Sequence, residues 1–285
     1  MDAADRNIVS SNLVMLPDKD EVISAEFTKE YEFASFTLGI NKRGNIKIYN
    51  KNRKDDYMKT AVNSKSSVLV FTDKGAVYNI PMVILQNLKD KEISLEDITD
   101  GFDGAKEKVL NIVSSKNLTE SASVYFFSKS GLVKKTNLKE FIGDYTEIQS
   151  YKFKNEDDKL VSIEFGPSED SLLIMITSKG MAIKFDSGNV NPMGRVASGV
   201  MGISLKDEDS VVFGKVITKN KNIKDSKVGE LALTCDDFNE ITLVTSKKET
   251  KTIKVEDIKI QNRAGRGNNI FLVVMNDYVK SVKIK

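Results

Sequence analysis

The chain has 285 residues, of which 40% are hydrophobic and 29% charged, and its formal net charge is +2. This composition supports a folded core and argues against general disorder. The sequence has no histidine and a single cysteine, which excludes Ser-His-Asp and Cys-His nucleophile pairs, histidine-containing zinc sites and an intrachain disulfide. We therefore expect no catalytic site, no metal site and no cofactor.

The first 34 residues include acidic Asp2 and Asp5 and no long apolar run, so they do not resemble a secretory signal. No stretch approaches the roughly 18 consecutive apolar residues of a membrane span, and we expect none. The lone Cys235 fits a reducing, cytoplasmic setting, where its ordinary role is that of a small buried side chain. We expect residues 1–34 to form a lead-in with strands of a first blade, and residues 35–285 to form the main domain.

One unit recurs along the chain: an apolar run, a polar turn that usually contains glycine, and a shorter strand that carries lysine. The copies lie at residues 36–49, 68–78, 124–136, 172–185 and 241–254, with a partial sixth copy at 271–280. The turn glycines are Gly44, Gly75, Gly131 and Gly180, whereas the fifth copy turns near Lys247 without glycine. A repeat of this kind decides the fold class before any other feature.

Each unit predicts a β-hairpin. The apolar run is rich in Val, Ile, Leu and Phe, which suits a strand buried on both faces. The glycine supplies the positive φ that a tight turn needs. The returning strand alternates imperfectly and carries a lysine three or four residues after the glycine, so we expect it near a sheet edge with one side in water.

The turn glycines are 31, 56 and 49 residues apart. A period of roughly 50 residues is typical of a four-stranded propeller blade. The length then predicts an all-β fold with five or six blades, six being favoured. The uneven spacing predicts long connectors, such as the acidic stretch 80–108 with short helical turns near 94–98.

Positive charge is concentrated at one end of the sequence. Between Val211 and Lys285 there are 15 Lys and Arg residues against 9 Asp and Glu residues, whereas acidic residues outnumber basic ones before this stretch. Such an excess indicates either a nucleic-acid contact or a solvated lysine-rich surface.

Two glycine-containing segments follow the fourth and fifth hairpins: Asn191 to Asp209, and the heptad Gln261-Asn-Arg-Ala-Gly-Arg-Gly267. Both resemble connectors in the C-terminal domain of the A subunit of bacterial gyrase and topoisomerase IV. The heptad is similar to that family's gyrase box, of the type Gln-Arg-Arg-Gly-Gly-Lys-Gly. The run from Lys74 to Pro81 resembles the topoisomerase IV version from Gram-positive bacteria.

This resemblance implies a β-pinwheel, a propeller-like disc of four-stranded blades that exchange strands with their neighbours. It also implies that double-stranded DNA is bound on a basic rim and presented for strand passage or substrate selection. The implied partners are DNA, the breakage-reunion domain of the same A subunit, plus the ATPase B subunit. A domain of this kind is not an enzyme by itself, and the implied location is cytoplasmic and nucleoid-associated.

The heptad departs from the gyrase box in two ways. Asn262 and Ala264 replace the second and fourth box residues, and the heptad lies near the end of the sequence rather than in the first blade. We therefore favour topoisomerase IV over gyrase and do not expect strong gyrase-like wrapping.

Arginine offers forked donors that suit phosphate oxygens, and glycine lets the backbone approach a duplex closely. Contacts to the phosphate backbone position a protein without reading sequence, as a general DNA-bending domain requires. The candidate DNA-binding residues are Arg263, Arg266, Gln261, Arg195, Lys134, Lys135, Lys184, Lys251 and Lys254. The candidate loop glycines are Gly265, Gly267, Gly194 and Gly199.

Each candidate also has an ordinary interpretation. The heptad could be a simple turn between strands, Arg195 could form a structural ion pair, and the lysines could be solvated. The acidic run 207–209 indicates a polar turn between blades rather than a metal site. At the level of function, the near-neutral net charge leaves a protein-interaction scaffold as the alternative, while the lack of histidine argues against a hydrolase.

Overall fold

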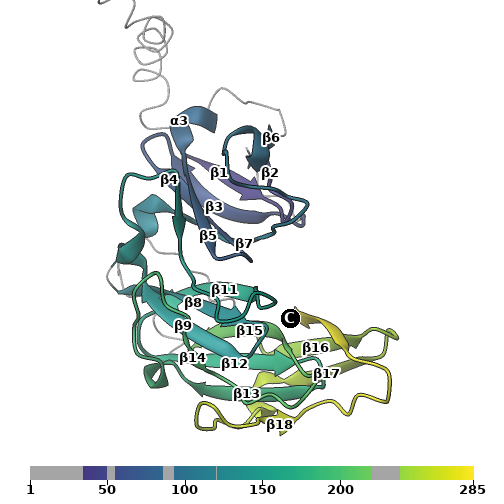
Figure 1. The fold of residues 1–285 in the computed structure, drawn as a ribbon. Coiled ribbons are helices and arrows are strands. Elements are labelled where there is room, and N and C mark those ends of the chain that lie inside the picture. The colour runs from purple at the N-terminus through teal and green to yellow at the C-terminus, as the bar shows by residue number, and fades with distance from the viewer. Residues whose placement is uncertain (1–34, 50–54, 86–92, 120, 220–237) are drawn as a thin grey trace, which may run out of the picture.

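The computed structural model describes residues 35–49, 55–85, 93–119, 121–219 and 238–285, and the predicted lead-in at 1–34 lies outside them. Five antiparallel sheets, here called blades 1 to 5, follow one another along the chain (Figure 1). This all-β arrangement confirms the predicted β-pinwheel. The described residues contain five sheets, the lower of the two predicted counts, and not the six that were favoured.

Blades 1 to 4 have four strands each, and blade 5 has three among the described residues. Blade 1 contains β1 (Ser35–Ile40), β2 (Asn45–Tyr49), β3 (Met58–Asn63) and β6 (Ile93–Ser94). Blade 2 contains β4 (Ser67–Thr72), β5 (Ala76–Pro81), β7 (Val109–Ser114) and β10 (Glu147–Gln149). Blade 3 contains β8 (Ala122–Ser128), β9 (Leu132–Asn137), β11 (Leu160–Pro167) and β14 (Val200–Met201).

Blade 4 contains β12 (Ser171–Thr177), β13 (Met181–Asp186), β15 (Val211–Thr218) and β18 (Asn268–Asn269). Blade 5 contains β16 (Glu240–Thr245), β17 (Thr250–Lys254) and β19 (Val279–Ile284). Short helical turns occupy the connections: α3 (Met82–Leu85), η1 (Leu95–Asp97), η2 (Ser115–Asn117), η3 (Leu138–Phe141), η4 (Ser187–Asn189) and η6 (Val255–Asp257). The turn at η1 confirms the helical turns expected near 94–98.

The outermost strand of each four-stranded blade is donated by the next blade. Strand β14 pairs with β9 in blade 3, although it follows the β12–β13 hairpin of blade 4. Strand β18 joins blade 4 in the same way from behind the β16–β17 hairpin. The strands at the opposite edges (β3, β7, β11, β15 and β19) contact one another in chain order. These inner strands therefore form the centre, and the exchanged strands lie at the periphery.

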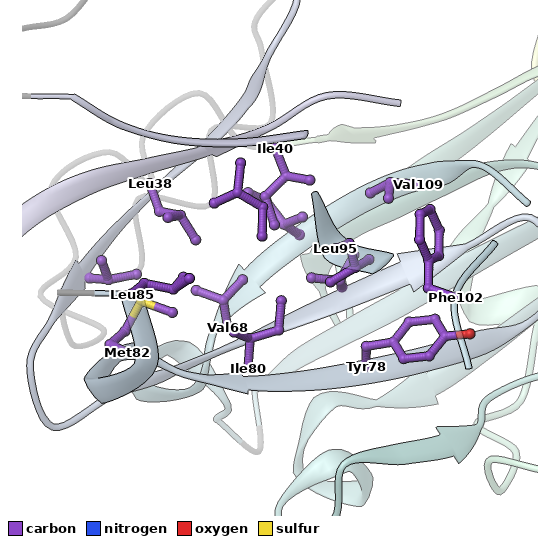
Figure 2. Close-up of a cluster of buried hydrophobic side chains, with 14 residues drawn as sticks. Leu38, Ile40, Val68, Tyr78, Ile80, Met82, Leu85, Leu95, Phe102 and Val109 are labelled. Carbon is purple, nitrogen blue, oxygen red and sulfur yellow. The ribbon is translucent and has the colours of Figure 1, made fainter. Parts of the chain in front are cut away.

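The core lies between the blades, which explains the unbroken apolar runs. In β4, Val68 and Val70 face a cluster shared with blade 1, whereas Leu69 and Phe71 face a cluster shared with blade 3. Successive residues of a strand point to opposite faces, so a blade packed on both sides needs apolar residues at every position. Figure 2 shows the first of these clusters, in which Leu38 and Val109 belong to strands of different blades.

The expected exposure of the returning strands was wrong for β9 and β13. Both are buried at their four central positions, because the exchanged strands β14 and β18 cover the edge that the sequence pattern left open. Strand β17 has no exchanged neighbour among the described residues, and it is largely exposed as expected. The partial sixth repeat at 271–280 forms no blade of its own, since its end enters β19 of blade 5.

The hairpin tips of neighbouring blades are hydrogen-bonded through the start of each inner strand. The first residue of an inner strand donates its amide to the tip of the preceding blade: Val109 to Lys42 (3.0 Å), Leu160 to Asp73 (3.0 Å), Val211 to Lys129 (2.9 Å) and Val279 to Ser178 (2.8 Å). The tips therefore lie side by side along one edge of the molecule. We call this edge the turn row.

An acidic residue two positions before each of the inner strands β7, β11, β15 and β19 caps the tip of its own blade. Glu107 accepts a hydrogen bond from Thr72, and Asp158 accepts from the amide and hydroxyl of Ser130. The corresponding residues of blades 4 and 5 are Asp209, bonded to Ser178 and Lys179, and Asp277, bonded to Ser246 and Lys247. The acidic run at 207–209 thus forms the predicted polar turn, and its role is structural.

We expect acid to weaken the fold through Asp277. Burial acts to raise the pKa of this carboxyl, but hydrogen bonds from Ser246 and from the amides of Tyr278 and Lys247 outweigh it and hold the pKa far below its usual range. The stabilisation is complete above the unfolded pKa of about 4 and is lost as the pH falls toward the folded value. In chemical unfolding, Asp277→Asn should be less stable than wild type at neutral pH, and the difference should close in acid.

Exposed Asp207 supplies the control, because it lies in the corresponding loop of blade 4. Asp207→Asn should unfold like the wild type at every pH. Equal stability of Asp277→Asn and wild type at neutral pH would contradict the capping role.

Candidate nucleic-acid interface

Three connectors are hydrogen-bonded side by side along the periphery and form one surface. We call it the connector belt, and it comprises residues 145–153, 191–204 and 260–270. The first two segments are joined where the hydroxyl of Tyr151 donates to the carbonyl of Ser198 at 2.5 Å. The exchanged strands β10, β14 and β18 lie within these segments, so strand exchange itself carries the belt from blade to blade.

The second and third segments are joined by reciprocal main-chain bonds. Ala264 donates its amide to the carbonyl of Gly202, and Ser204 donates to Gly265, both at 2.9 Å. The heptad is therefore packed against the glycine-rich segment of the preceding blade. The two segments that the sequence marked as related lie next to each other in space.

These two segments are basic. Arg195 lies in the second, and Arg263 and Arg266 lie in the third. No Asp or Glu occurs between residues 187 and 205 or between residues 258 and 276. Cations without neighbouring carboxylates along a continuous surface are the electrostatic pattern that attracts a phosphate backbone.

The heptad holds its arginines in different ways. Arg263 is half-buried, and its guanidinium donates to the carbonyls of Asn189 (3.0 Å) and Met201 (2.5 Å), so it fixes the third segment on the second. Arg266 is exposed and has no hydrogen bond or ion pair with any other described residue. Gln261 is half-buried and anchors the heptad through its main-chain amide, which donates to the carbonyl of Lys184 at 2.8 Å. Arg266 is thus the heptad side chain best placed to contact a ligand.

The four loop glycines fall into two pairs. Gly199 and Gly267 have φ of +79° and +75°, and an added Cβ would lie 2.6 and 2.5 Å from a main-chain oxygen of the neighbouring returning strand. The fold therefore requires glycine at positions 199 and 267. Around Gly194 no atom would lie within 4 Å of a Cβ, and around Gly265 the nearest would be 3.4 Å away. These two glycines are free of any steric demand from the protein.

The prediction that Lys135 and Lys184 contact DNA is corrected by their burial, since their exposed fractions are 4% and 7%. The ammonium of Lys135 donates to the carbonyls of Ser168 and Ser187, both at 3.2 Å, and that of Lys184 donates to Val255 at 2.9 Å. Ser187 and Val255 begin the helical turns η4 and η6 of the next blade. Both lysines therefore join neighbouring blades, and burial lowers the pKa of each.

Lys134 does not reach the surface either, because its side chain is fully buried. Its ammonium donates to three main-chain carbonyls: Ser150 (2.5 Å), Arg195 (2.5 Å) and Gly194 (3.3 Å). These acceptors belong to the first and second belt segments. Lys134 thus lies beneath the belt and cannot touch a phosphate directly.

Lys251 and Lys254 remain exposed, as expected for the uncovered edge strand β17. Lys254 lies 3.4 Å from the carboxylate of Glu256, and both side chains are solvated. A surface ion pair of this kind contributes little to stability and leaves the lysine available. Both residues remain candidates for a DNA contact.

Sequence reasoning missed the cations of the turn row. Every hairpin tip presents an exposed basic residue one or two positions before the turn residue with positive φ: Arg43, Lys74, Lys129, Lys179 and Lys247. The signal was present in the Lys-Gly and Arg-Gly turns, but these pairs were interpreted only as turn formers. Exposed carboxylates such as Glu156 and Asp207 lie among them, so the turn row is mixed in charge, unlike the second and third belt segments.

The described residues contain no group of three or more Cys, Asp or Glu side chains that could hold a metal ion. None of their helices is long and apolar enough to cross a membrane.

The fold defines the chain as a β-pinwheel, and comparisons with known proteins identify its relatives. The family model "DNA gyrase C-terminal domain, beta-propeller" matches residues 122–143, 171–218 and 250–282. The DNA gyrase A subunit of Helicobacter pylori J99 is 28% identical over 231 residues, which are 80% of this chain and 26% of the relative. The DNA topoisomerase 4 A subunit of Staphylococcus aureus MRSA252 is 26% identical over 265 residues, 89% of this chain and 29% of the relative.

Solved structures agree on the fold. The C-terminal domain of DNA topoisomerase IV has a TM-score of 0.73 at 22% identity, covering 88% of this chain and 78% of that domain. The Escherichia coli ParC C-terminal domain has a TM-score of 0.63 at 12% identity, covering 88% and 98%. The chain is thus similar to the C-terminal β-propeller domains of gyrase and topoisomerase IV A subunits, and it spans less than a third of the length of these two curated relatives.

Proposed function

We propose that this chain binds double-stranded DNA without sequence specificity through the connector belt and bends it. In the full enzyme this would present DNA for strand passage or substrate selection by a bacterial type II topoisomerase. The supporting observation is the continuous belt on which Arg195, Arg263 and Arg266 lie without carboxylates in the same segments. Its partners in the cytoplasm would be DNA, the breakage-reunion domain of the same A subunit, plus the ATPase B subunit.

The proposed role requires no chemistry from this chain. Smoothly bending about 20–30 base pairs costs roughly 1–6 kcal/mol, so several phosphate contacts must act together along a curved surface. A belt carried from blade to blade by exchanged strands supplies such a surface. Non-specific contacts of this kind weaken steeply with salt, because bound phosphates release counterions. Strand cleavage and ATP hydrolysis belong, in this proposal, to other domains of the enzyme.

The test is a topology assay on nicked circular plasmid, incubated with the protein at low salt, ligated, freed of protein and resolved as topoisomers. We expect salt-sensitive retention of DNA with little or no linking-number shift, as befits a topoisomerase IV domain with a divergent heptad. A shift that grows with protein concentration and disappears at high salt would instead assign gyrase-like wrapping. No retention and no shift would exclude DNA binding.

A protein-interaction scaffold is the second candidate. The observation in its favour is a group of exposed apolar side chains between the heptad and β19, where Leu272 and Met275 are 79% and 85% exposed. Apolar groups of this size on a surface often mark a protein contact. Loss of DNA retention in the assay, together with intact folding, would favour this function.

A further inference from the structure

Lys134 is a cation buried directly beneath the connector belt, in an unusual environment. Its side chain is fully buried, and no carboxylate among the described residues is paired with it. Its three protons meet the carbonyls of Ser150, Gly194 and Arg195. A buried charge is tolerated only when its hydrogen-bonding capacity is satisfied, and a lysine ammonium has three donors. The main chain of the belt thus takes the place of a counter-ion.

Two aromatic rings complete the environment. The ammonium lies 4.7 Å from the ring centre of Phe126 on β8 and 5.5 Å from that of Tyr151 on the first belt segment. Tyr151 in turn donates to Ser198 in the second segment, so both the ring and the charge join the same two segments. Burial raises the pKa of the Tyr151 hydroxyl, so this group stays neutral and supplies no counter-charge to Lys134. The nearby charged side chain of Arg195 is part of the second belt segment.

The fold does not require a lysine at this position. Lys134 lies opposite Phe126 in blade 3, and the residue at the same register in blade 4 is Ile183, opposite Met175. Ile183 is also fully buried, and it lies beneath the heptad, with its side chain 3.7 Å from the position of a Cβ on Gly265. An apolar side chain therefore supports the third belt segment where lysine supports the second. The lysine adds something other than packing.

We infer that Lys134 is a positioning residue for the DNA-binding belt: its buried ammonium fixes the main chain at Ser150, Gly194 and Arg195, so that two connectors act as one surface. The inference rests on the proposed function of the belt. Because the carbonyl of Arg195 is bonded to the buried ammonium, the main chain from which the Arg195 side chain extends is fixed. Deprotonation of the Lys134 ammonium removes the charge that holds the three carbonyls together, and this part of the belt then becomes less rigid.

The geometry makes the effect measurable near neutral pH. Burial lowers the pKa of Lys134 to about 7. The chain has no histidine, so no imidazole titrates in this range. DNA affinity should therefore fall as the pH rises through this value.

The experiment measures the affinity of the full chain for a fluorescent 30-base-pair duplex (about three helical turns) by anisotropy at constant ionic strength, between about pH 6 and pH 8.5. The wild-type affinity should fall roughly fivefold to tenfold across this range. Lys134→Met should bind more weakly at the acid end and show no fall. Lys135→Met is the matched control, since it removes a buried lysine of the same strand whose ammonium bonds Ser168 and Ser187, outside the belt, and it should keep the wild-type pH profile.

Amide hydrogen exchange gives a readout that does not depend on DNA. In Lys134→Met the amides of residues 150–152 and 196–199 should exchange at least about tenfold faster than in wild type, while those of β9 stay protected. If wild type binds no DNA at any pH, the proposed function fails, and the exchange rates alone decide whether Lys134 fixes the connectors. Unchanged exchange, or an unchanged pH profile of DNA binding in Lys134→Met, would overturn the inference.

Discussion

Replacing Gly180 with alanine should destabilise the protein by about 3 kcal/mol, which is the largest effect we expect from adding a single methyl group. Gly180 has a φ of +74°, and an added Cβ would lie 2.1 Å from the carbonyl oxygen of Phe271. The carbonyl of Gly180 also accepts the amide of Ile270 at 2.9 Å, directly after the exchanged strand β18. The new side chain would strain the turn and push the exchanged strand away from blade 4.

Gly194→Ala is the matched control. It lies in the same kind of glycine-rich region, yet no atom would lie within 4 Å of its Cβ and its φ is not positive. Its free energy of unfolding in urea should match the wild type within about 0.5 kcal/mol. If both variants proved equally stable, the close contact between the hairpin turn and the exchanged strand would not exist in solution.

The hairpins could be predicted from the sequence because their determinants are local. The apolar runs, the turn glycines and the spacing of the copies each indicate the same structure, and all five predicted hairpins are present. Even the glycine-free copy fits, since Lys248 takes the positive φ of 69° that glycine supplies elsewhere. The η1 turn was likewise visible, because Ser94 and Asp97 form a capping box within four residues.

The burial of the lysines could not be predicted from the hairpins alone. Lys134, Lys135 and Lys184 occupy strands that would be edges in an isolated hairpin, and an edge strand tolerates charge. They are buried because strands from the following blade cover them, and that pairing joins residues more than 60 positions apart, such as Val133 and Val200. The family resemblance implied strand exchange, but the hairpin sequences do not show which side chains an exchanged strand covers.

The belt itself was partly predictable. The two glycine-rich segments were recognised as related, and the structure brings them together through Ala264 and Gly202. The sequence could not distinguish the two roles of these glycines, because φ and the space around each Cβ are properties of the folded chain. Gly199 and Gly267 serve the fold, whereas Gly194 and Gly265 leave the backbone accessible, as a close approach to DNA requires.

The belt and the turn row also differ in whether the fold requires carboxylates there. The acids of the turn row include caps, such as Asp158 and Asp209, that the hairpins require. Because the fold itself needs carboxylates there, the turn row stays mixed in charge. In the second and third belt segments, main-chain bonds replace such caps, so positive charge can accumulate without a structural need for acids.

This contrast leads to a charge-matched test of where DNA binds. Replacing Arg195, Arg263 and Arg266 together with glutamine should lower the affinity for duplex DNA roughly 100-fold at low salt. Each lost phosphate contact should also reduce the slope of log affinity against log salt by about one, so the triple variant should lose about three. Fluorescence anisotropy over a salt series measures both quantities.

The control removes the same charge from the turn row, by replacing Lys74, Lys129 and Lys179 with glutamine. These lysines are exposed at three successive tips, so the variant should fold normally and lose less than about fivefold in affinity through net charge alone. Since Arg263 also holds Asn189 and Met201, the double variant of Arg195 and Arg266 separates binding from folding, and it should lose about two from the salt slope. A larger loss of affinity in the turn-row variant than in the belt variant would contradict the belt as the interface and would place DNA at the hairpin tips instead.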